Sequence, residues 1–415
     1  MLKRVGVLFM WVGLVSVLFC LQVSASTNLS FAIWINEPTE IQKTEDMFRE
    51  YEKANPGISV TLFQQPYSGY HERIQVMAAA GIPPDIITTD RMYVPAFAEA
   101  GIIQPLDALV KADPDLDLQK DVTEIVSGTY LGRFYGIPIR GGPSVMAYNV
   151  AAFDEAGLAR PVKMVADDNW TWETFVEVGK KLTIDRTGDG VPDRFAVTRT
   201  GTHIPVWASR IWQAGGRVLS DDGQTVLIDQ PEAIRGLEYL VSLTWDHHIA
   251  PQPGEGADLK NGTAAMTYAW VSESINLANS VNFEIDLVMF PAGPKGYFHT
   301  AGGNPVAVSS ATPHLQEAYH LAKWFAMDSG TRGLPASVKV LRRDYLPMLG
   351  QYVASPEQVA LALQYPTRME PKVHPKGPEL EAAWVPLLQN AFEGRASVHE
   401  VVTNLANVLR AILSR

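Results

Sequence analysis

Cysteine is almost absent from this 415-residue sequence, in which Cys20 is the single example. Cys20 lies in an apolar stretch at the start of the chain, so residues 26–415 have no thiol. Disulfides, a thiol nucleophile and a cysteine-containing metal site are therefore excluded there. Basic charge is also scarce, since 34 Lys and Arg stand against 45 Asp and Glu, a formal net charge of −11. This acidic balance argues against a nucleic-acid or anionic-membrane binder.

Several enzyme signatures are missing as well. The sequence has no G-x-S-x-G nucleophile elbow, no HExxH zinc motif and no P-loop. What remains is a composition of 47% hydrophobic and 19% charged residues, which is typical of a soluble globular protein. At this length the chain is too long for one ordinary core, and we expect two domains.

The N-terminus has the form of an export signal. Basic "MLKR" precedes a long apolar run, and "VSA" at 23–25 places small residues at a cleavage site, so we expect a signal peptide over 1–25 that is cleaved after Ala25. Two alternatives stay open. The run approaches the ~18 residues that span a membrane, and Cys20 offers a lipid site, although Phe19 before it is large. We expect a periplasmic or extracellular protein, with a membrane-anchored form as the alternative.

Strand-like and helix-like stretches alternate after the leader. Strands are predicted at 29–35, 58–65 and 85–89, with helices at 40–55, 70–81 and 94–101. This β-α-β rhythm indicates a mostly parallel sheet with helices on both faces, in which ligands bind beyond the carboxyl ends of the strands. Polar and aromatic residues lie at or just after the carboxyl end of each strand: Trp34 and Glu37, then Tyr67, then Asp90 and Arg91. We expect them to form one rim of a cleft.

A second α/β pattern begins after "FYGIPIRGGPSVMAYN". It includes "NWTWETFVEVGKKLT", in which Thr171 is positioned to cap a helix. The last forty residues predict two helices separated by Gly394.

Ordered motifs cover nearly the whole chain after the leader. They include "WIN" near the start, "PPDII…D" followed by "GIIQPLD", "YGIPI…YN…FDEAGL", "TWETF…KKLT", "DRTGDGVPDRF", "FPAGPKG…GGN" and "GRASVHEVVTNL". Each is weak alone, but together and in this order they resemble the carbohydrate-type solute-binding proteins of bacterial ABC importers, the group that includes maltose-binding protein.

The resemblance implies an α/β clamp of two lobes, each a mostly parallel sheet flanked by helices. Three crossings between the lobes are expected near 138–142, 290–294 and 341–346. The N-terminal lobe is then 26–139 plus 293–343, and the C-terminal lobe is 140–292 plus 344–415. The implied monomer closes over a sugar by hinge bending and presents it to the transmembrane permease subunits of an importer.

A sugar offers hydroxyls that charged side chains bind in pairs and apolar faces that stack on aromatic rings. Asp90 is the leading candidate, with helix capping as the alternative. Arg91 is either its partner or a surface charge. Arg140, at the first crossing, suits an acidic sugar or several hydroxyls; the alternative is a structural salt bridge at the hinge.

Other ligand-binding candidates come from strand ends and from the resemblance. After "WIN" this chain has Glu37-Pro38-Thr39 where maltose-binding protein has Gly-Asp-Lys, which puts an α-glucan ligand in doubt. Trp34 is equally compatible with a core position. The remaining candidates are Tyr67, Trp207, Trp270, Gly303 and Trp384, and for Trp384 core packing is an equally strong alternative.

The stretch "DRTGDGVPD" places Asp185, Asp189 and Asp193 at positions 1, 5 and 9 of an EF-hand-like loop. Thr187 and Ala196 stand where two further ligands belong, so an Asp/Gly-rich turn is favoured over a calcium site. We expect no cofactor.

Other functions stay open. Asp90 and Glu37 have the residue types of a glycosidase pair, which sits about 5–10 Å apart. The same clamp also suits a non-sugar solute such as a glycerophosphodiester or a polyamine. An uncleaved leader would suit an anchored sensor. The sequence identifies neither the sugar nor the importer subunits.

Overall fold

The computed structural model describes residues 26–415 except 36, 124, 199–200, 202–203, 301–302, 329–333, 366 and 369–373. The expected signal peptide, residues 1–25, lies outside these residues, so its cleavage stays a prediction. Among the helices that are described, none is both long enough and apolar enough to cross a membrane.

The strands are β1 Thr27–Trp34, β2 Ile58–Gln65, β3 Ile86–Thr88, β4 Thr129–Tyr130, β5 Arg133–Phe134, β6 Gly136–Arg140, β7 Ser144–Asn149, β8 Phe195–Val197, β9 Ala264–Trp270, β10 Ile285–Val288, β11 His299–Thr300, β12 Asn304–Val308 and β13 Thr367–Arg368. The α-helices are α1 Pro38–Ala54, α2 Tyr70–Ala79, α3 Val94–Glu99, α4 Asp107–Ala112, α5 Leu118–Asp121, α6 Val150–Glu155, α7 Pro161–Ala166, α8 Trp172–Leu182, α9 Ile204–Ala214, α10 Pro231–Trp245, α11 Ser274–Asn279, α12 Leu315–Met327, α13 Val338–Val340, α14 Leu346–Leu349, α15 Glu357–Ala362, α16 Gly377–Phe392 and α17 Val398–Leu413. Short 3₁₀ turns lie at η1 Arg91–Tyr93, η2 Ile125–Gly128 and η3 Val271–Glu273, and a π-helical turn at η4 Leu341–Tyr345.

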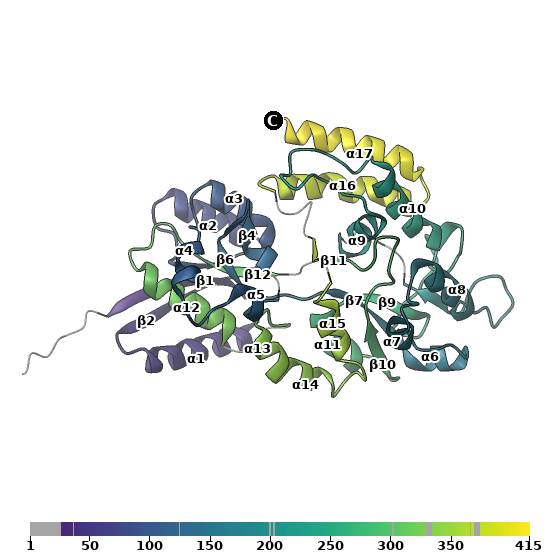
Figure 1. The fold of residues 1–415 in the computed structure, drawn as a ribbon, viewed down its shortest axis with the longest axis horizontal. Coiled ribbons are helices and arrows are strands. Elements are labelled where there is room, and N and C mark those ends of the chain that lie inside the picture. The colour runs from purple at the N-terminus through teal and green to yellow at the C-terminus, as the bar shows by residue number, and fades with distance from the viewer. Residues whose placement is uncertain are drawn as a thin grey trace, which may run out of the picture.

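The first lobe is built on a five-stranded sheet in the order β2-β1-β3-β12-β6. Helix α1 buries Thr44, Phe48 and Tyr51, which share one face because they are four and three residues apart. The ring of Phe31 in β1 lies 4.9 Å from that of Phe48 and 4.7 Å from that of Phe325 in α12, measured between centroids. Two helices distant in sequence therefore share the core of this sheet (Figure 1).

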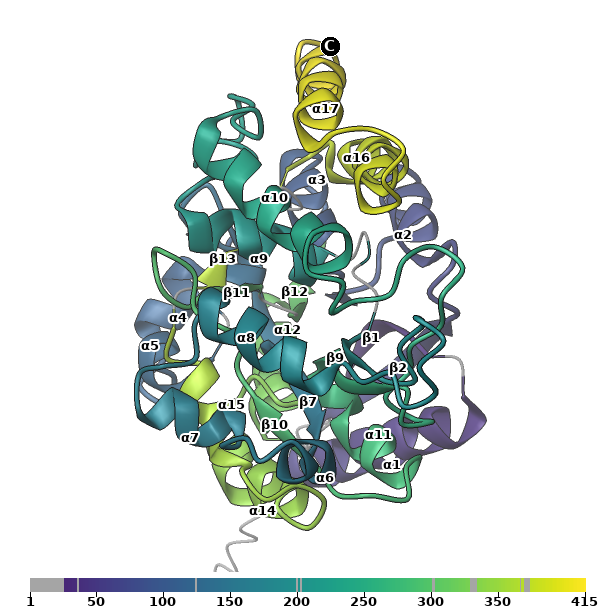
Figure 2. The ribbon, with the colours of Figure 1, turned by 90° about the vertical axis from the view of Figure 1, so that its right-hand side faces the viewer.

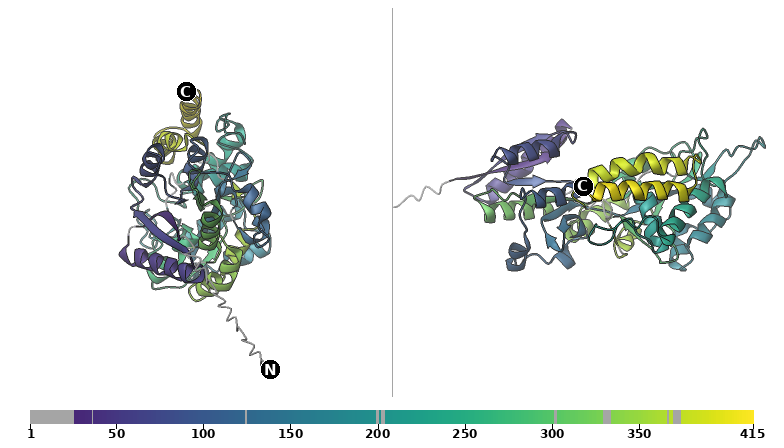
Figure 3. Two further views of the ribbon diagram at one scale, coloured as in Figure 1. Left: turned by 90° about the vertical axis from the view of Figure 1, so that its left-hand side faces the viewer. Right: turned by 90° about the horizontal axis from the view of Figure 1, so that it is seen from above.

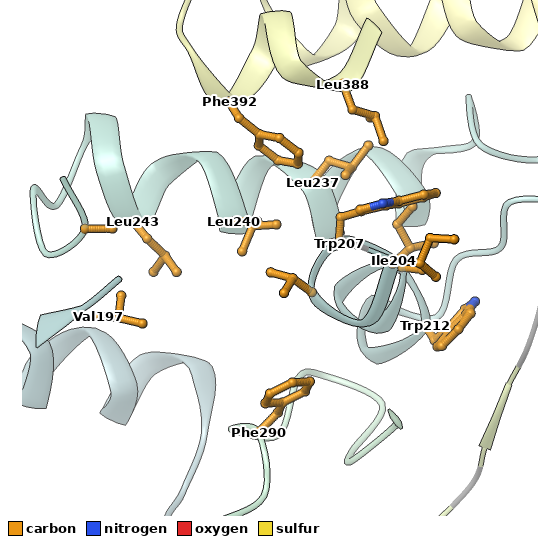
Figure 4. Packing of buried hydrophobic residues seen from close by; sticks show 14 of the residues in the cluster. Val197, Ile204, Trp207, Trp212, Leu237, Leu240, Leu243, Phe290, Leu388 and Phe392 are labelled. Atoms are coloured by element: carbon orange, nitrogen blue, oxygen red, sulfur yellow. The ribbon is translucent and has the colours of Figure 1, made fainter. Parts of the chain in front are cut away.

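The second lobe is built on a four-stranded sheet in the order β10-β7-β9-β8. Its main core joins this sheet to α8, α9, α10, α16 and α17. Trp207 of α9 lies among Leu237 of α10 and Leu388 of α16 (Figure 4). Helices α16 and α17 pack side by side along the outside of this lobe (Figures 2 and 3).

Strand direction explains where the site lies. The chain passes from β6 directly into β7 and, between β10 and β12, back to the first sheet. Each entering strand starts at the edge that faces the other lobe, so β7 and β12 are antiparallel to both of their neighbours. The other strands of both sheets point their carboxyl ends at this junction.

The expected two-lobed clamp is confirmed, but its sheets are mixed and not mostly parallel. β1 pairs in parallel with β2 and β3, whereas the second sheet has one parallel pair, β8 with β9, and two antiparallel pairs. A strand that enters the sheet from the hinge without a crossover helix must run antiparallel to its neighbours. The local sequence of the strand does not indicate this direction. The exact limits of the two lobes stay a prediction.

Candidate functional site

A cavity of about 280 Å³ lies where the two sheets face each other. We call it the inter-lobe cavity. The first lobe lines it with residues after β3, at the end of β6 and at the start of β12, and the second lobe with residues after β9. Four predicted residues meet in it, namely Asp90, Arg91, Arg140 and Trp270. Because both lobes contribute, a molecule in the cavity contacts both.

Asp90 uses its two carboxylate oxygens differently. Oδ1 accepts a hydrogen bond of 3.0 Å from the backbone N–H of Met92 and caps η1, which confirms the capping alternative. Oδ2 lies 3.5 Å from the hydroxyl of Tyr67, which is 44% exposed. The cap therefore leaves one oxygen beside the cavity, and capping does not exclude ligand binding.

An aromatic cluster supports Asp90 from behind. Trp34 meets Tyr67 and Tyr70 edge-on, with ring centroids 5.6 and 5.3 Å apart. His71 stacks on Tyr93, with centroids 3.9 Å apart and planes within 2° of parallel. The side chain of His71 is 1% exposed, so this cluster is a packed wall of the first lobe.

His71 fixes the backbone of Asp90. Its Nε2 accepts a 3.0 Å hydrogen bond from the backbone N–H of Asp90, which requires an unprotonated nitrogen. Burial lowers the pKa of His71 to about 4, although the carboxylates of Asp90 and Glu72 act in the opposite direction. The imidazole is therefore neutral at neutral pH and serves as a fixed acceptor.

Arg140 brings a positive charge to the inter-lobe cavity. Burial lowers its pKa, and the negative charges of Glu40 and Asp90 oppose that effect. Its Nε is buried without a hydrogen-bond partner among the described residues, and no ion pair joins it to any of them. The expected hinge salt bridge is therefore not found in this part of the chain, and the guanidinium keeps donors for a ligand.

A second cavity of about 300 Å³ adjoins the first and belongs to the second lobe. Trp270 lines both cavities. Tyr268, Phe290, Val206 and Glu273 are among the other residues that line this second-lobe pocket. Its rings offer stacking surface, while the inter-lobe cavity adds the charged side chains of Asp90, Arg91 and Arg140 and the amide of Asn304.

Helix α16 approaches the first lobe at the same edge and contacts η1. Burial and the carboxylate of Asp90 raise the pKa of Tyr67, and Glu381 of α16 adds to this effect. Glu381 also raises the pKa of Tyr93, after burial and nearer carboxylates. A second-lobe acid thus lies close to the aromatic cluster of the first lobe.

Trp207 was expected to bind ligand and Trp384 was a candidate with core packing as the alternative, and the structure places both in the core. Each is 0% exposed, and their rings lie 5.8 Å apart in the core of the second lobe. The turn of each helix directs the ring inward, so neither ring touches the cavities.

The other predicted residues lie around the cavities rather than in them. Trp34 is half-buried in the aromatic cluster. Glu37 is exposed at the start of α1 and does not line either cavity. Gly303 is buried next to Asn304, which does line the inter-lobe cavity. Arg91 lines the same cavity, and no ion pair joins it to Asp90 among the described residues, which favours the surface-charge alternative.

The loop 185–193 uses its acids to hold its own turn. Asp185 accepts hydrogen bonds from the N–H groups of Gly188 (2.7 Å) and Gly190 (2.9 Å). Asp189 accepts one from Val191, and Asp193 accepts one from Thr187. Among the described residues no group of three or more His, Cys, Asp or Glu side chains is arranged to hold a metal ion. These contacts favour the turn interpretation, and calcium binding remains to be tested.

Sequence reasoning missed His71, Tyr268 and Phe290. His71 lies inside a helical stretch whose pattern gives no hint of a bond to Asp90. Tyr268 has a weak signal, because it is two residues before Trp270 on the same strand and so shares its face. Phe290 follows β10 and has none.

Comparison with known proteins agrees with a binding site between two lobes. A family model described as "Bacterial extracellular solute-binding protein" matches residues 37–331. The maltotriose-binding protein of Pyrococcus abyssi is 24% identical over 374 residues, 85% of this chain and 74% of that protein. An arabinooligosaccharide-binding protein of Halalkalibacterium halodurans is 24% identical over 314 residues, 71% of this chain and 66% of that protein.

Solved structures share the fold. The cyclic alpha-maltosyl-1,6-maltose binding protein of Arthrobacter globiformis superposes with a TM-score of 0.76 at 20% identity, covering 93% of this chain and 99% of that one. An ABC substrate-binding protein of Listeria monocytogenes in complex with cycloalternan gives 0.74 at 20% identity, with 93% and 99% covered. At this identity the likeness shows the fold alone. The match to the family model extends over most of the chain, and the protein belongs to the bacterial extracellular solute-binding protein family.

Proposed function

We propose that the protein is the exported substrate-binding component of an ABC importer, which captures an oligosaccharide between its lobes and delivers it to a membrane permease. The observation that carries the proposal is the inter-lobe cavity, which is lined by Asp90 and Arg140 from strand ends of the first sheet and by Trp270 from the second sheet. Carboxylate and guanidinium groups bind sugar hydroxyls in pairs, and the indole stacks on a sugar ring.

The family and its relatives narrow the ligand class. Extracellular solute-binding proteins work outside the cytoplasm, and two relatives are named as a maltotriose-binding and an arabinooligosaccharide-binding protein. The second-lobe pocket adds room beside the inter-lobe cavity and shares Trp270 with it. This adjacency supports a ligand of more than one sugar unit. Release of the mature chain by cleavage after Ala25 is part of the proposal.

A thermal-shift screen tests the function. The panel contains mono- and oligosaccharides, sugar acids, polyols, glycerophosphodiesters and polyamines. A ligand present at 100-fold over its Kd should stabilise the folded state by about 2.7 kcal/mol. A response restricted to polyamines or glycerophosphodiesters would overturn the sugar assignment but keep the clamp.

The hydrolase alternative is checked with the same sugars. Asp90 and Glu37 do not line one cavity together, so the structure does not support them as a catalytic pair. Each sugar that raises the melting temperature is incubated with the protein and its products are analysed. We expect stoichiometric binding of the intact sugar, whereas catalytic turnover would contradict the proposal.

A further inference from the structure

Arg210 of α9 is a buried cation without a buried anion beside it. Its side chain is 1% exposed, and none of the described acidic residues forms an ion pair with it. Its Nη1 donates to Ser209 Oγ (3.0 Å) and to Gln213 Oε1 (3.3 Å). A buried charge normally needs an opposite charge, because neutral hydrogen bonds only partly replace its hydration.

Aromatic rings enclose the guanidinium. Its central carbon lies 4.5 Å from the ring centroid of Phe290 and 5.8 Å from that of Tyr268. Phe290 lies on the side of α9 that faces away from α16 (Figure 4). Both rings also line the second-lobe pocket. Arg210 therefore lies directly behind two rings that line the pocket.

Neighbouring polar groups add donors rather than acceptors. Among the described residues, Arg210 Nε, Gln213 Nε2 and the hydroxyls of Tyr239 and Tyr268 are all buried, and none of them makes a hydrogen bond of good geometry. The hydroxyl oxygen of Tyr268 lies close enough to the Arg210 guanidinium for that contact to oppose the rise in its pKa that burial causes, and its O–H remains free to donate. Gln213 Oε1 is already occupied, since Trp172 Nε1 donates to it at 3.0 Å as well as Arg210. The amide orientation is thereby fixed, with its NH₂ group left over.

These groups come from three elements and lie within reach of one another. Tyr239 of α10 stacks on Trp172 at 3.9 Å, and Trp172 is the residue bonded to Gln213. Burial raises the pKa of both Tyr239 and Tyr268, while the guanidinium of Arg210 acts on both in the opposite direction. Both hydroxyls therefore stay protonated and remain donors beside the same cation.

We propose that Arg210, Gln213, Tyr239 and Tyr268 form an anion-binding site next to the second-lobe pocket. A group that only accepts hydrogen bonds and carries negative charge matches a set of unpaired donors around an uncompensated guanidinium. The occupant is either a free small anion such as chloride or the acid group of a ligand in the pocket. The case of a ligand acid group rests on the proposed function and makes the ligand an acidic sugar. The case of a free small anion is independent of the proposed function.

Two variants and one control test the site in the full mature protein. Tyr268→Phe removes one donor and keeps the ring, and Arg210→Met removes the charge. Arg194→Met is the matched control, because Arg194 is also buried but has a carboxylate partner in Glu155 at 2.6 Å. If Arg210→Met fails to fold, Tyr268→Phe still carries the test.

The first arm uses inorganic anions alone. Melting temperature is measured without sugar while chloride replaces a bulky sulfonate buffer anion at constant ionic strength. A free-anion site predicts a saturable rise of a few degrees in the wild type and in Arg194→Met, weakened in Tyr268→Phe and lost in Arg210→Met. Crystals soaked in bromide should show an anomalous peak within hydrogen-bond distance of Arg210 Nε.

The second arm compares neutral sugars with their uronic-acid counterparts. A ligand-acid site predicts that Tyr268→Phe weakens binding of the acidic sugar at least tenfold more than binding of the neutral one. Absence of an anion effect in both arms, or a water molecule at Arg210 in crystals of both the bromide-soaked and the sugar-bound protein, overturns the proposal. If both variants bind the neutral and the acidic sugar as tightly as wild type does, the transport function stands while the acidic-ligand form fails.

Discussion

Asp90 performs two tasks with one carboxylate, and its replacement should separate them. Asp90→Ala should weaken ligand binding by about 1.5–3 kcal/mol, or roughly 10- to 150-fold in Kd, because a charged acceptor for hydroxyls is lost. It should also cost about 1 kcal/mol of unfolding free energy, because the cap on Met92 is lost.

Asp117→Ala provides the control for the Asp90 experiment. Asp117 caps α5 in the same way, by accepting from the N–H of Gln119, and it does not line either cavity. It should lose similar stability with unchanged affinity. Denaturation and calorimetric titration of both variants give both quantities, and an Asp90→Ala protein that binds like wild type would remove Asp90 from the site.

His71 makes stability depend on pH. Burial lowers its pKa to about 4 in the folded protein, against about 6.5 for a free imidazole. Between these values the unfolded chain takes up a proton that the folded chain does not, so the free energy of unfolding falls as pH drops. The share from His71 should be about 2 kcal/mol between pH 7.5 and pH 5.

Urea denaturation at the two pH values measures this effect. His71→Gln should be less stable than wild type at pH 7.5 and should lose less stability on acidification. His399→Gln, at an exposed position of α17, should keep the wild-type slope. Identical pH slopes in His71→Gln and wild type would show that His71 is not the group responsible.

The sequence predicts the cavity-lining residues correctly at strand ends but not inside helices. Asp90, Arg140 and Trp270 end strands, and strand ends of both lobes meet at one junction whatever the side chains pack against. Trp207 and Trp384 lie within helices, where a shift of one position turns a ring by about 100°. Their inward direction depends on the core and not on local pattern.

At the scale of elements, α9 and α10 pack unusually closely through a glycine. A Cβ added to Gly236 of α10 would lie 2.5 Å from the carbonyl oxygen of Arg210 and 2.6 Å from the Cα of Ile211. Both atoms are backbone, so the helices would have to separate.

Gly236→Ala should therefore destabilise the protein although alanine is the better helix former. Overpacking costs about 1–3 kcal/mol or more where backbone must move, against a gain of about 1 kcal/mol in helix propensity. We expect a net loss of unfolding free energy in urea. Glu238→Ala, on the exposed side of the same helix, should be neutral or mildly stabilising; stabilisation by Gly236→Ala would refute the close approach.

Local signals predict element ends well. Thr171 accepts a hydrogen bond from the N–H of Thr174 as the cap of α8, and Gly394 has a φ of +68° between α16 and α17. Both depend only on neighbouring residues. The direction of β7 and β12 does not, since it is set by where the chain enters each sheet.

At the scale of the whole molecule, the fold converts strand ends of two sheets into the walls of one cavity. A ligand there contacts both lobes, so it stabilises the closed arrangement by its extra contacts in that state. The two-lobed architecture was implied by the family resemblance that the ordered motifs carry. The width of the cavity and its full set of lining residues could not be predicted from the sequence, because they depend on how the two lobes pack against each other.

Calorimetric titration of the best sugar from the screen into wild type and Trp270→Ala tests the central claim most directly. Trp270 lines both cavities, whereas Trp245, 38% exposed, lines neither and serves as the control in Trp245→Ala. The account predicts one sugar bound per wild-type chain with a negative heat-capacity change. It also predicts a Kd at least tenfold weaker in Trp270→Ala and unchanged in Trp245→Ala. Equal affinity in Trp270→Ala and wild type would contradict binding between the lobes.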